Sequence, residues 1–249
     1  MFVPFFMQGV VGVSATESGT IMTPMMITMI IGSVVGGRLV YRIGVKTQLI
    51  VGMAIMLSAF GLLGTMDVDT SKWTATLYMI VLGLGTGLVM PILTLALQES
   101  FPKSELGVVT SSSQFFRSIG GTFGMTVLGA IMNHRSSTLL DERLMPKLEA
   151  LPAQAKGAVD RFADMIHTDP QGLYSVLLSP EAMAKIPALL RDMFVPVLKQ
   201  SLVDSLQAVF WFGLAFIAVG LLLVFGLKRI ALSDRAEAMK PLKQAKETE

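Results

Sequence analysis

Few residues in this 249-residue chain could carry out catalysis or bind a metal ion. The chain has no cysteine and only two histidines, His134 and His167. Cysteine-ligated metal sites and disulfides are therefore excluded, and a histidine cluster is not expected. The sequence contains no glycine-rich nucleotide loop ending in Gly-Lys-Ser/Thr, no H-E-x-x-H and no G-x-S-x-G motif. We therefore expect a protein that is not an enzyme and has no metal or organic cofactor.

Arg117 is the residue whose position could matter most, because it interrupts the apolar stretch 106–133. In a helix that begins near Leu106, Arg117 lies roughly 16 Å along the axis, near the middle of a bilayer core about 30 Å thick. A charge at that depth must face protein or water and have a partner. The candidates are a backbone carbonyl, a polar side chain such as Gln8 or Gln114, a bound anion, or an acid outside this chain. Arg117 is either a static tie between helices or a group that couples the movement of a substrate or proton.

The elements that must position these residues are predicted to be membrane helices. Hydrophobic residues make up 52% of the chain and charged residues only 15%, whereas soluble domains contain about 25% charged residues. Mean hydropathy is +0.63. Long stretches without charge, each about 20 residues or more, are sufficient to cross a bilayer. The sequence predicts an all-α integral membrane protein with five spans, at 18–41, 46–66, 73–98, 106–133 and 205–228.

Charge in the short loops predicts the orientation of the spans. Arg38, Arg42 and Lys46 place the loop 38–46 in the cytoplasm. Residues 1–12 are too short to span alone, and we interpret them as the outer part of a further helix. The net charge of +2 is spread over separate loops, so nucleic-acid binding is not expected.

The segments outside the spans have a different composition. Residues 134–204 are mixed in charge and contain several prolines, which predicts an extracytoplasmic helical insert. Within it, Ser179-Pro180-Glu181 is typical of a helix start, while Pro187 and Pro196 should kink or interrupt the helix that follows. The insert is either a solvated linker or a cap over the outer opening of a transport path. The tail 229–249 is predicted to be cytoplasmic and disordered.

Small residues recur on single faces of the predicted spans. The glycines on these faces are Gly32 and Gly36, Gly83 and Gly87, and Gly121 and Gly124. Glycines four residues apart allow helix backbones to approach closely in lipid. Such faces either pack statically or slide during a conformational cycle. Pro24 and Pro91 also lie inside spans, where each should kink or loosen the helix.

Together these residues resemble the major facilitator superfamily, in its fourteen-helix branch of drug:proton antiporters. Four stretches carry the resemblance: 3–24, 37–46, 83–91 and 107–124, of which the last is the most specific. The resemblance covers residues 1–133 and 205–228 and corresponds to the C-terminal half of such a transporter. One position departs from the family pattern, since the loop motif usually has an acid before Arg42, and here that residue is Tyr41.

The resemblance implies alternating access between two six-helix halves, with the substrate bound near the midplane. The residues that it places along the substrate path are Phe5, Gln8, Gly87, Pro91, Thr94, Gln114 and Arg117. The residues that it places at the interface between halves or in the gating motif are Pro24, Gly32, Gly36, Gly37, Arg38, Arg42, Gly44, Gly120, Gly121 and Gly124. It also implies proton as the coupling ion and a small, hydrophobic, drug-like substrate.

The expected surroundings of the chain follow from the same resemblance. It implies a multi-pass protein of the bacterial inner or plasma membrane, in contact with lipid. The partner that it requires is an N-terminal half of six to eight helices, so the chain is expected to be a fragment or truncated product of an efflux transporter. The alternative is a small membrane interaction or regulatory protein without transport activity, with residues 134–204 as its recognition segment.

Overall fold

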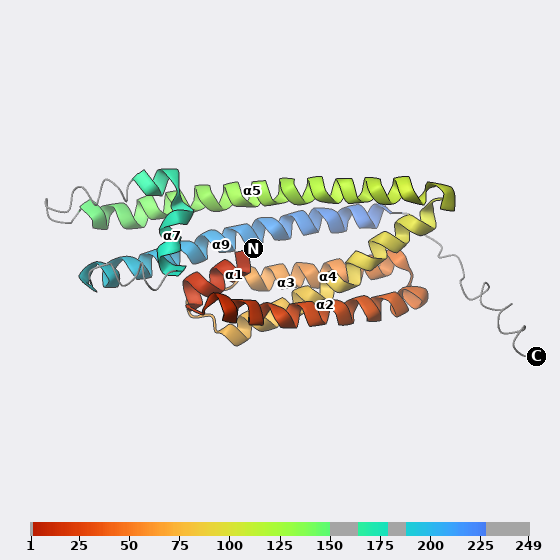
Figure 1. Ribbon diagram of the computed structural model, residues 1–249, viewed down its shortest axis with the longest axis horizontal. Helices are drawn as coiled ribbons and strands as arrows, with labels where there is room; N and C mark the ends of the chain where they lie inside the picture. The colour runs from red at the N-terminus through yellow and green to blue at the C-terminus, as the bar shows by residue number, and fades with distance from the viewer. Residues whose placement is uncertain (1, 150–163, 179–187, 228–249) are drawn as a thin grey trace, which may run out of the picture.

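The computed structural model describes residues 2–149, 164–178 and 188–227, and every regular element within these ranges is helical (Figure 1). The elements in chain order are α1 (Phe2–Phe6), the π-helix η1 (Met7–Val11), α2 (Ala15–Ile43), α3 (Val45–Gly64), α4 (Lys72–Ser100), the 3-10 helix η2 (Lys103–Glu105), α5 (Leu106–Glu149), α7 (Pro170–Leu178) and α9 (Ala188–Gly226).

Five of these helices, α2, α3, α4, α5 and α9, are long and apolar enough to cross a membrane. The predicted all-α membrane fold with five full spans is therefore confirmed. Helix 2–11 is apolar but shorter than a span, as its length in the sequence predicts.

Local sequence determines where α2 begins and where it gives way to α3. Ser14 Oγ accepts a hydrogen bond from the Glu17 backbone N–H at 3.1 Å, and the Glu17 carboxylate accepts one from the Ser14 backbone N–H at 3.3 Å. This reciprocal pair is a capping box that satisfies the free N–H groups at the start of α2. The helix ends at Gly44, whose φ of +80° is accessible to glycine at little cost, and α3 starts at the next residue.

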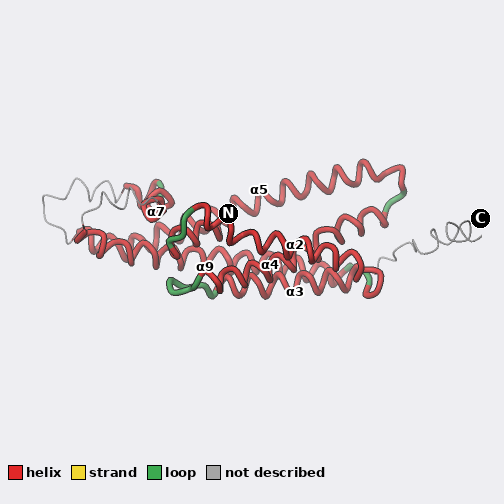
Figure 2. The backbone as a smooth tube through the Cα atoms, turned by 60° about the horizontal axis from the view of Figure 1, so that its bottom comes forward, coloured by secondary structure: helices red, strands yellow, loops and turns green. Residues whose placement is uncertain are grey.

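The long helices pack in a row. Helix α2 packs against α4, α4 against α3, α3 against α9, and α9 against α5. Figure 2 shows the first half of α5 diverging from the other helices. The row therefore has two outer members, α2 and the first half of α5, each with a side that the described part of the chain leaves open.

The α2–α4 contact depends on glycine. A Cβ atom on Gly32 would lie 2.8 Å from the Leu84 carbonyl oxygen, and a Cβ on Gly87 would overlap the Met29 carbonyl oxygen. Only residues without a side chain allow these two backbones to approach so closely. The spacing in the sequence thus corresponds to a real crossing point for Gly32 and Gly87.

The region 134–204 is organised differently from the expected set of separate short helices. Helix α5 continues from its spanning part to Glu149, and α9 is already helical at Ala188, so the two extend side by side beyond the other helices (Figure 1). The expected interruption at Pro196 is not observed, because α9 continues through it. Buried Phe194, Val197 and Leu198 pack against the neighbouring helices around this proline, and we infer that this packing compensates for the hydrogen bond that proline removes.

The described residues of 134–204 form a unit that we call the outer extension, since the sequence predicts that it lies outside the membrane. It has a hydrophobic core of its own that continues into the spanning helices. The buried cluster joins Leu140, Leu144 and Leu148 of α5, Leu173 and Tyr174 of α7, Leu198 and Leu202 of α9, and Phe6 and Met7. The extension is therefore packed against the outer end of the first helix. The predicted helix start at Ser179, the proline at 187 and the tail 229–249 lie outside the described residues.

Candidate transport path and helix faces

Helices α2 and α5 are the least covered of the five spanning helices. Within their most apolar stretches, 11% of residues in α2 and 6% in α5 are buried, compared with 39% in α4. Both expose large apolar side chains, which include Ile27, Ile30, Ile31 and Val34 of α2 and Phe115, Phe116, Ile119 and Phe123 of α5. Lipid or further protein must cover these faces, because exposed apolar patches of this size are not stable in water.

Arg117 and Gln114 lie on the open part of α5, and both are exposed. Within the described residues, Arg117 makes no hydrogen bond or ion pair, so neither Gln8 nor Gln114 is its partner in this arrangement. A Cβ atom at Gly120, Gly121 or Gly124 would meet nothing within 4 Å. The charged residue and these glycines therefore share a sparsely covered part of the helix.

The path residues on the other helices have mixed environments. Gly87 is buried against α2, while Pro91 and Thr94 are half-buried on α4. The Thr94 hydroxyl donates within its own helix to the Met90 carbonyl oxygen at 3.5 Å. Gln8 is half-buried in η1; π-helical turns of this kind are frequent at functional sites. The structure places Gly87 beside Gly32 but does not bring these residues into contact with Arg117.

Phe5 contacts the outer extension rather than the middle of the bundle. Its ring meets that of Tyr174 edge-on, with the ring centroids 6.4 Å apart. Lys199 of α9 also reaches the first helix, where its Nζ donates to the Val10 carbonyl oxygen at 2.8 Å. The outer end of this predicted path-lining helix is thus held by side chains from α7 and α9.

The loop motif at residues 37–46 contacts the end of α9 through one side chain. Arg38 and Arg42 are exposed at the end of α2, and Gly37 is open to its surroundings. Lys46 reaches across to α9, where its Nζ donates to the carbonyl oxygens of Phe225 and Leu227 at 2.7 and 2.8 Å. A cation at a helix C-terminus satisfies free carbonyls and complements the helix dipole. Lys46 therefore joins the start of α3 to the end of α9, at the side of the bundle that the loop charges predict to be cytoplasmic.

Sequence reasoning missed a buried amide near the same end. Gln48 of α3 is fully buried, and its Nε2 donates to the Leu88 carbonyl oxygen at 3.4 Å. This nitrogen lies 2.6 Å from where a Cβ on Gly36 would be. Gln48 therefore occupies the space that Gly36 leaves between α2, α3 and α4. The available signal was a lone glutamine in an otherwise apolar span.

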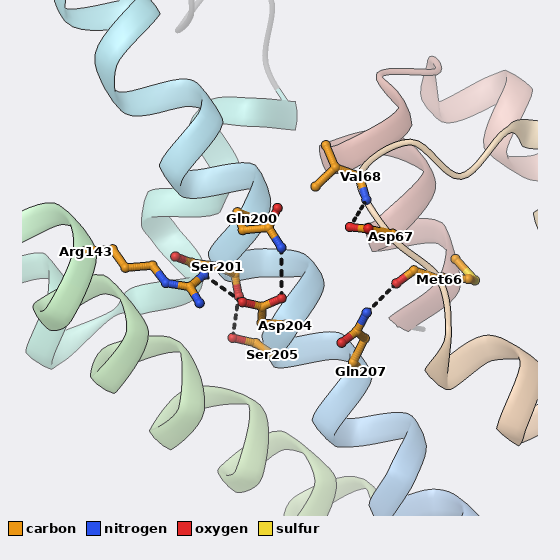
Figure 3. Close-up of polar contacts among 9 residues, drawn as sticks. All are labelled: Met66, Asp67, Val68, Arg143, Gln200, Ser201, Asp204, Ser205 and Gln207. Carbon is orange, nitrogen blue, oxygen red and sulfur yellow. Dashed lines mark hydrogen bonds and ion pairs between the residues drawn. The ribbon is translucent and has the colours of Figure 1, made fainter.

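A polar cluster in the outer extension was also missed (Figure 3). Arg143 of α5 and Asp204 of α9 form an ion pair of 2.6 Å. Gln200 Nε2 donates to the same carboxylate at 3.0 Å, and the Ser205 hydroxyl donates to the Ser201 carbonyl oxygen at 2.7 Å. One helix turn further along, Gln207 Nε2 donates to the Met66 carbonyl oxygen at 2.7 Å. These contacts fix α9 to α5 on one side and to the α3–α4 loop on the other.

Tyr174 of α7 lies beside this cluster and is fully buried. Burial raises the pKa of the Tyr174 hydroxyl above its usual value of 10.0, because the phenolate would lose its hydration. Ser136, Ser205 and the Arg143 guanidinium beside it offset part of that rise, whereas the Asp204 carboxylate adds to it. The hydroxyl is therefore neutral at physiological pH.

The fold and these helix faces define a polytopic helical membrane protein. The sequence profile of the Major Facilitator Superfamily matches residues 1–125, and the chain belongs to this family. The Multidrug transporter protein MdtP of Bacillus subtilis (strain 168) is 63% identical over 234 residues, which cover 94% of this chain and 43% of that protein.

Two more distant relatives are described as resistance proteins. Multidrug resistance protein 3 of Bacillus subtilis (strain 168) is 29% identical over 70% of this chain and 32% of its own length. The Tetracycline resistance determinant of Streptomyces rimosus is 32% identical over 74% of this chain and 46% of its own length. The chain thus spans less than half of the length of each of the three relatives.

Proposed function

We propose that this chain is the C-terminal half of a proton-coupled drug efflux transporter of the plasma membrane. The observation that carries the proposal is the sparse burial of α2 and α5, the two spanning helices at the edges of the row. Their open faces include the small residues of α5 and Arg117, which has no partner among the described residues. A second helical bundle that packs on both faces would enclose a cavity between the halves.

The names of the relatives support a drug-like substrate. One similar protein is described as a multidrug transporter and two as multidrug or tetracycline resistance proteins, and each is more than twice as long as the part that this chain matches. We infer that the additional length of these relatives supplies a complementary half that packs on the open faces. The absence of a nucleotide-binding motif in this chain favours an ion gradient over ATP as the energy source in this half.

The test uses inverted bacterial membrane vesicles that contain the complete transporter. A pH gradient, acid inside, should drive accumulation of a hydrophobic dye such as ethidium, and a protonophore should abolish it. Vesicles with this chain alone should accumulate no more dye than vesicles without it. Accumulation that is insensitive to the protonophore would contradict proton coupling, and full activity of the chain alone would contradict the requirement for a second half.

A further inference from the structure

A small cavity lies where α1, the end of the spanning part of α5, and α7 meet. Its volume is about 200 Å³, and its walls are Phe2, Phe5, Met125, Gly129, Met132 and Gln171. The charges of the cytoplasmic loop motif place this end of the bundle on the outer side of the membrane. The cavity is therefore separate from the middle of the spans, where Arg117 and Gly87 lie.

The chemistry of the walls selects for apolar aromatic groups. Two phenyl rings and two thioethers provide most of the surface, and none of the six lining side chains carries a charge. Aromatic rings pack edge-to-face or offset on one another, and methionine adapts its shape to a ring and contacts it favourably through sulfur. A permanently charged ligand would find no counter-ion in these walls.

One polar group is available to orient a ligand. The Gln171 Nε2 donates to the Asn133 Oδ1 at 2.8 Å, which fixes the plane of the amide. Within the described residues, the Gln171 Oε1 accepts no hydrogen bond, so it can accept one from a ligand hydroxyl or N–H group. A single oriented acceptor on an apolar wall is typical of small-molecule sites.

The roof of the cavity is held in place by packing. Leu173 and Tyr174, which follow Gln171 on α7, are fully buried against α5 and α9, and the Tyr174 ring contacts the ring of Phe5. Gly129 lies in another wall of the cavity, where a Cβ atom would project into open space, with nothing within 4 Å. Helix α7 thus contacts both α5 and α1 beside the cavity.

We propose that this cavity is an outer binding site for small, uncharged aromatic compounds that carry a hydrogen-bond donor. Such compounds stack on Phe2 and Phe5, contact the methionines of α5, and donate to Gln171 Oε1. The further step, that the site receives an exported compound before release under α7, rests on the proposed function. The binding site itself does not.

The test measures protection of introduced thiols in the complete transporter, in a background from which any cysteines outside this cysteine-free chain have been removed. Gly129→Cys places a thiol in the cavity wall. Ala130→Cys is the matched control, since Ala130 is the next residue of α5, is exposed and does not line the cavity. The probe is N-phenyl-1-naphthylamine, an uncharged aromatic amine with one N–H donor, and the readout is the rate of reaction with a methanethiosulfonate reagent.

The probe should slow the reaction at Gly129→Cys several-fold and leave that at Ala130→Cys unchanged. Adding Gln171→Ala should raise the probe concentration for half-protection about three- to tenfold, the effect of losing one hydrogen bond. Equal slowing at both positions, or slowing at neither, would overturn the proposed site. Protection that does not depend on Gln171 would overturn the orienting role of its amide.

These outcomes are independent of transport. Dye export without selective protection at Gly129→Cys would overturn the outer site and leave the proposed function intact. Selective protection in a protein that exports nothing would support the binding site and contradict the efflux function.

Discussion

At the scale of single residues, the predicted depth of Arg117 in the membrane bears on the proposed function, because a cation at that depth needs a polar partner. Its charge lies in the first half of α5, where the described part of the chain offers it no partner. A mid-membrane cation is stable only when it faces water or a polar group on protein. In the complete transporter that group must come from the other half, from a bound substrate or from water in the cavity.

Replacement of Arg117 tests this connection. Arg117→Ala should lower dye efflux by the complete transporter about tenfold or more, because a lost hydrogen bond to a charged group costs about 1.5–3 kcal/mol. Arg135→Ala is the matched control, since Arg135 is an exposed arginine on the same helix beyond the span. Efflux per molecule of membrane-inserted protein is the measurement. Equal efflux in the Arg117 variant and the wild type would leave Arg117 without a role in transport.

Tyr174 makes a prediction about pH. The folded protein raises the pKa of Tyr174 above 10.0, so folding favours the neutral hydroxyl. Its contribution to stability is complete below about pH 10 and falls as the pH rises through the higher folded pKa. Unfolding temperatures of the purified transporter, measured from pH 8 to above pH 11, should therefore decrease more steeply at high pH than those of Tyr174→Phe. Parallel curves for the two proteins would show that this hydroxyl does not contribute to alkaline unfolding.

At the scale of helices, glycines with the same spacing in the sequence have two different environments. Gly87 packs against the α2 backbone. A Cβ atom on Gly120, Gly121 or Gly124 would have no described neighbour within 4 Å. The sequence shows the same small-residue spacing in both helices. Only the packing distinguishes an internal crossing from a face that the described part of the chain leaves open.

This difference can be measured with one substitution in each helix. Gly87→Ala forces a methyl group against the Met29 carbonyl and should destabilise the helix bundle by about 1–3 kcal/mol. Gly120→Ala has open space in this chain and should leave the stability of the bundle within about 0.5 kcal/mol. Resistance of the purified protein to unfolding by increasing sodium dodecyl sulfate is the readout. A loss of stability for Gly120→Ala as large as that for Gly87→Ala would mean that the α5 face packs as tightly as the α2–α4 crossing.

At the scale of the whole molecule, the gaps between charges lie close to α2, α3 and α4, whereas α5 and α9 extend beyond the predicted spans. Charges end each span at water, so the gaps between them locate α2, α3 and α4 to within a few residues. Residues 134–149 are rich in charge, and they read as the start of a separate insert. Their helix is stabilised by α9, through contacts such as the Arg143–Asp204 pair, which joins residues far apart in the chain. No local pattern encodes such a contact.

The path residues show the same limit. The glycine spacing predicts a close contact between helices, and Gly32 of α2 and Gly87 of α4 do meet. The relation of Phe5 to Arg117 cannot, because it depends on how the first helix seats against α7 and α9. The cavity at Gln171 could not be predicted from the sequence, because its walls come from α1, α5 and α7, which lie far apart in the chain.

The proposed packing of a second bundle on α5 makes a prediction about the surroundings of that helix. Gln114 lies on the same helix as Arg117 and is exposed in this chain, as is Leu223 near the end of α9. In the complete transporter a second bundle should shield Gln114 from lipid, whereas Leu223 should remain in contact with it. Spin labels at Gln114→Cys and Leu223→Cys report this through their collision rates with oxygen, which dissolves preferentially in the lipid. The rate should be low at Gln114→Cys and high at Leu223→Cys. Equally high rates would place the polar part of α5 against lipid, where an unpaired Arg117 is least stable, and would contradict the assembly on which the proposed efflux function depends.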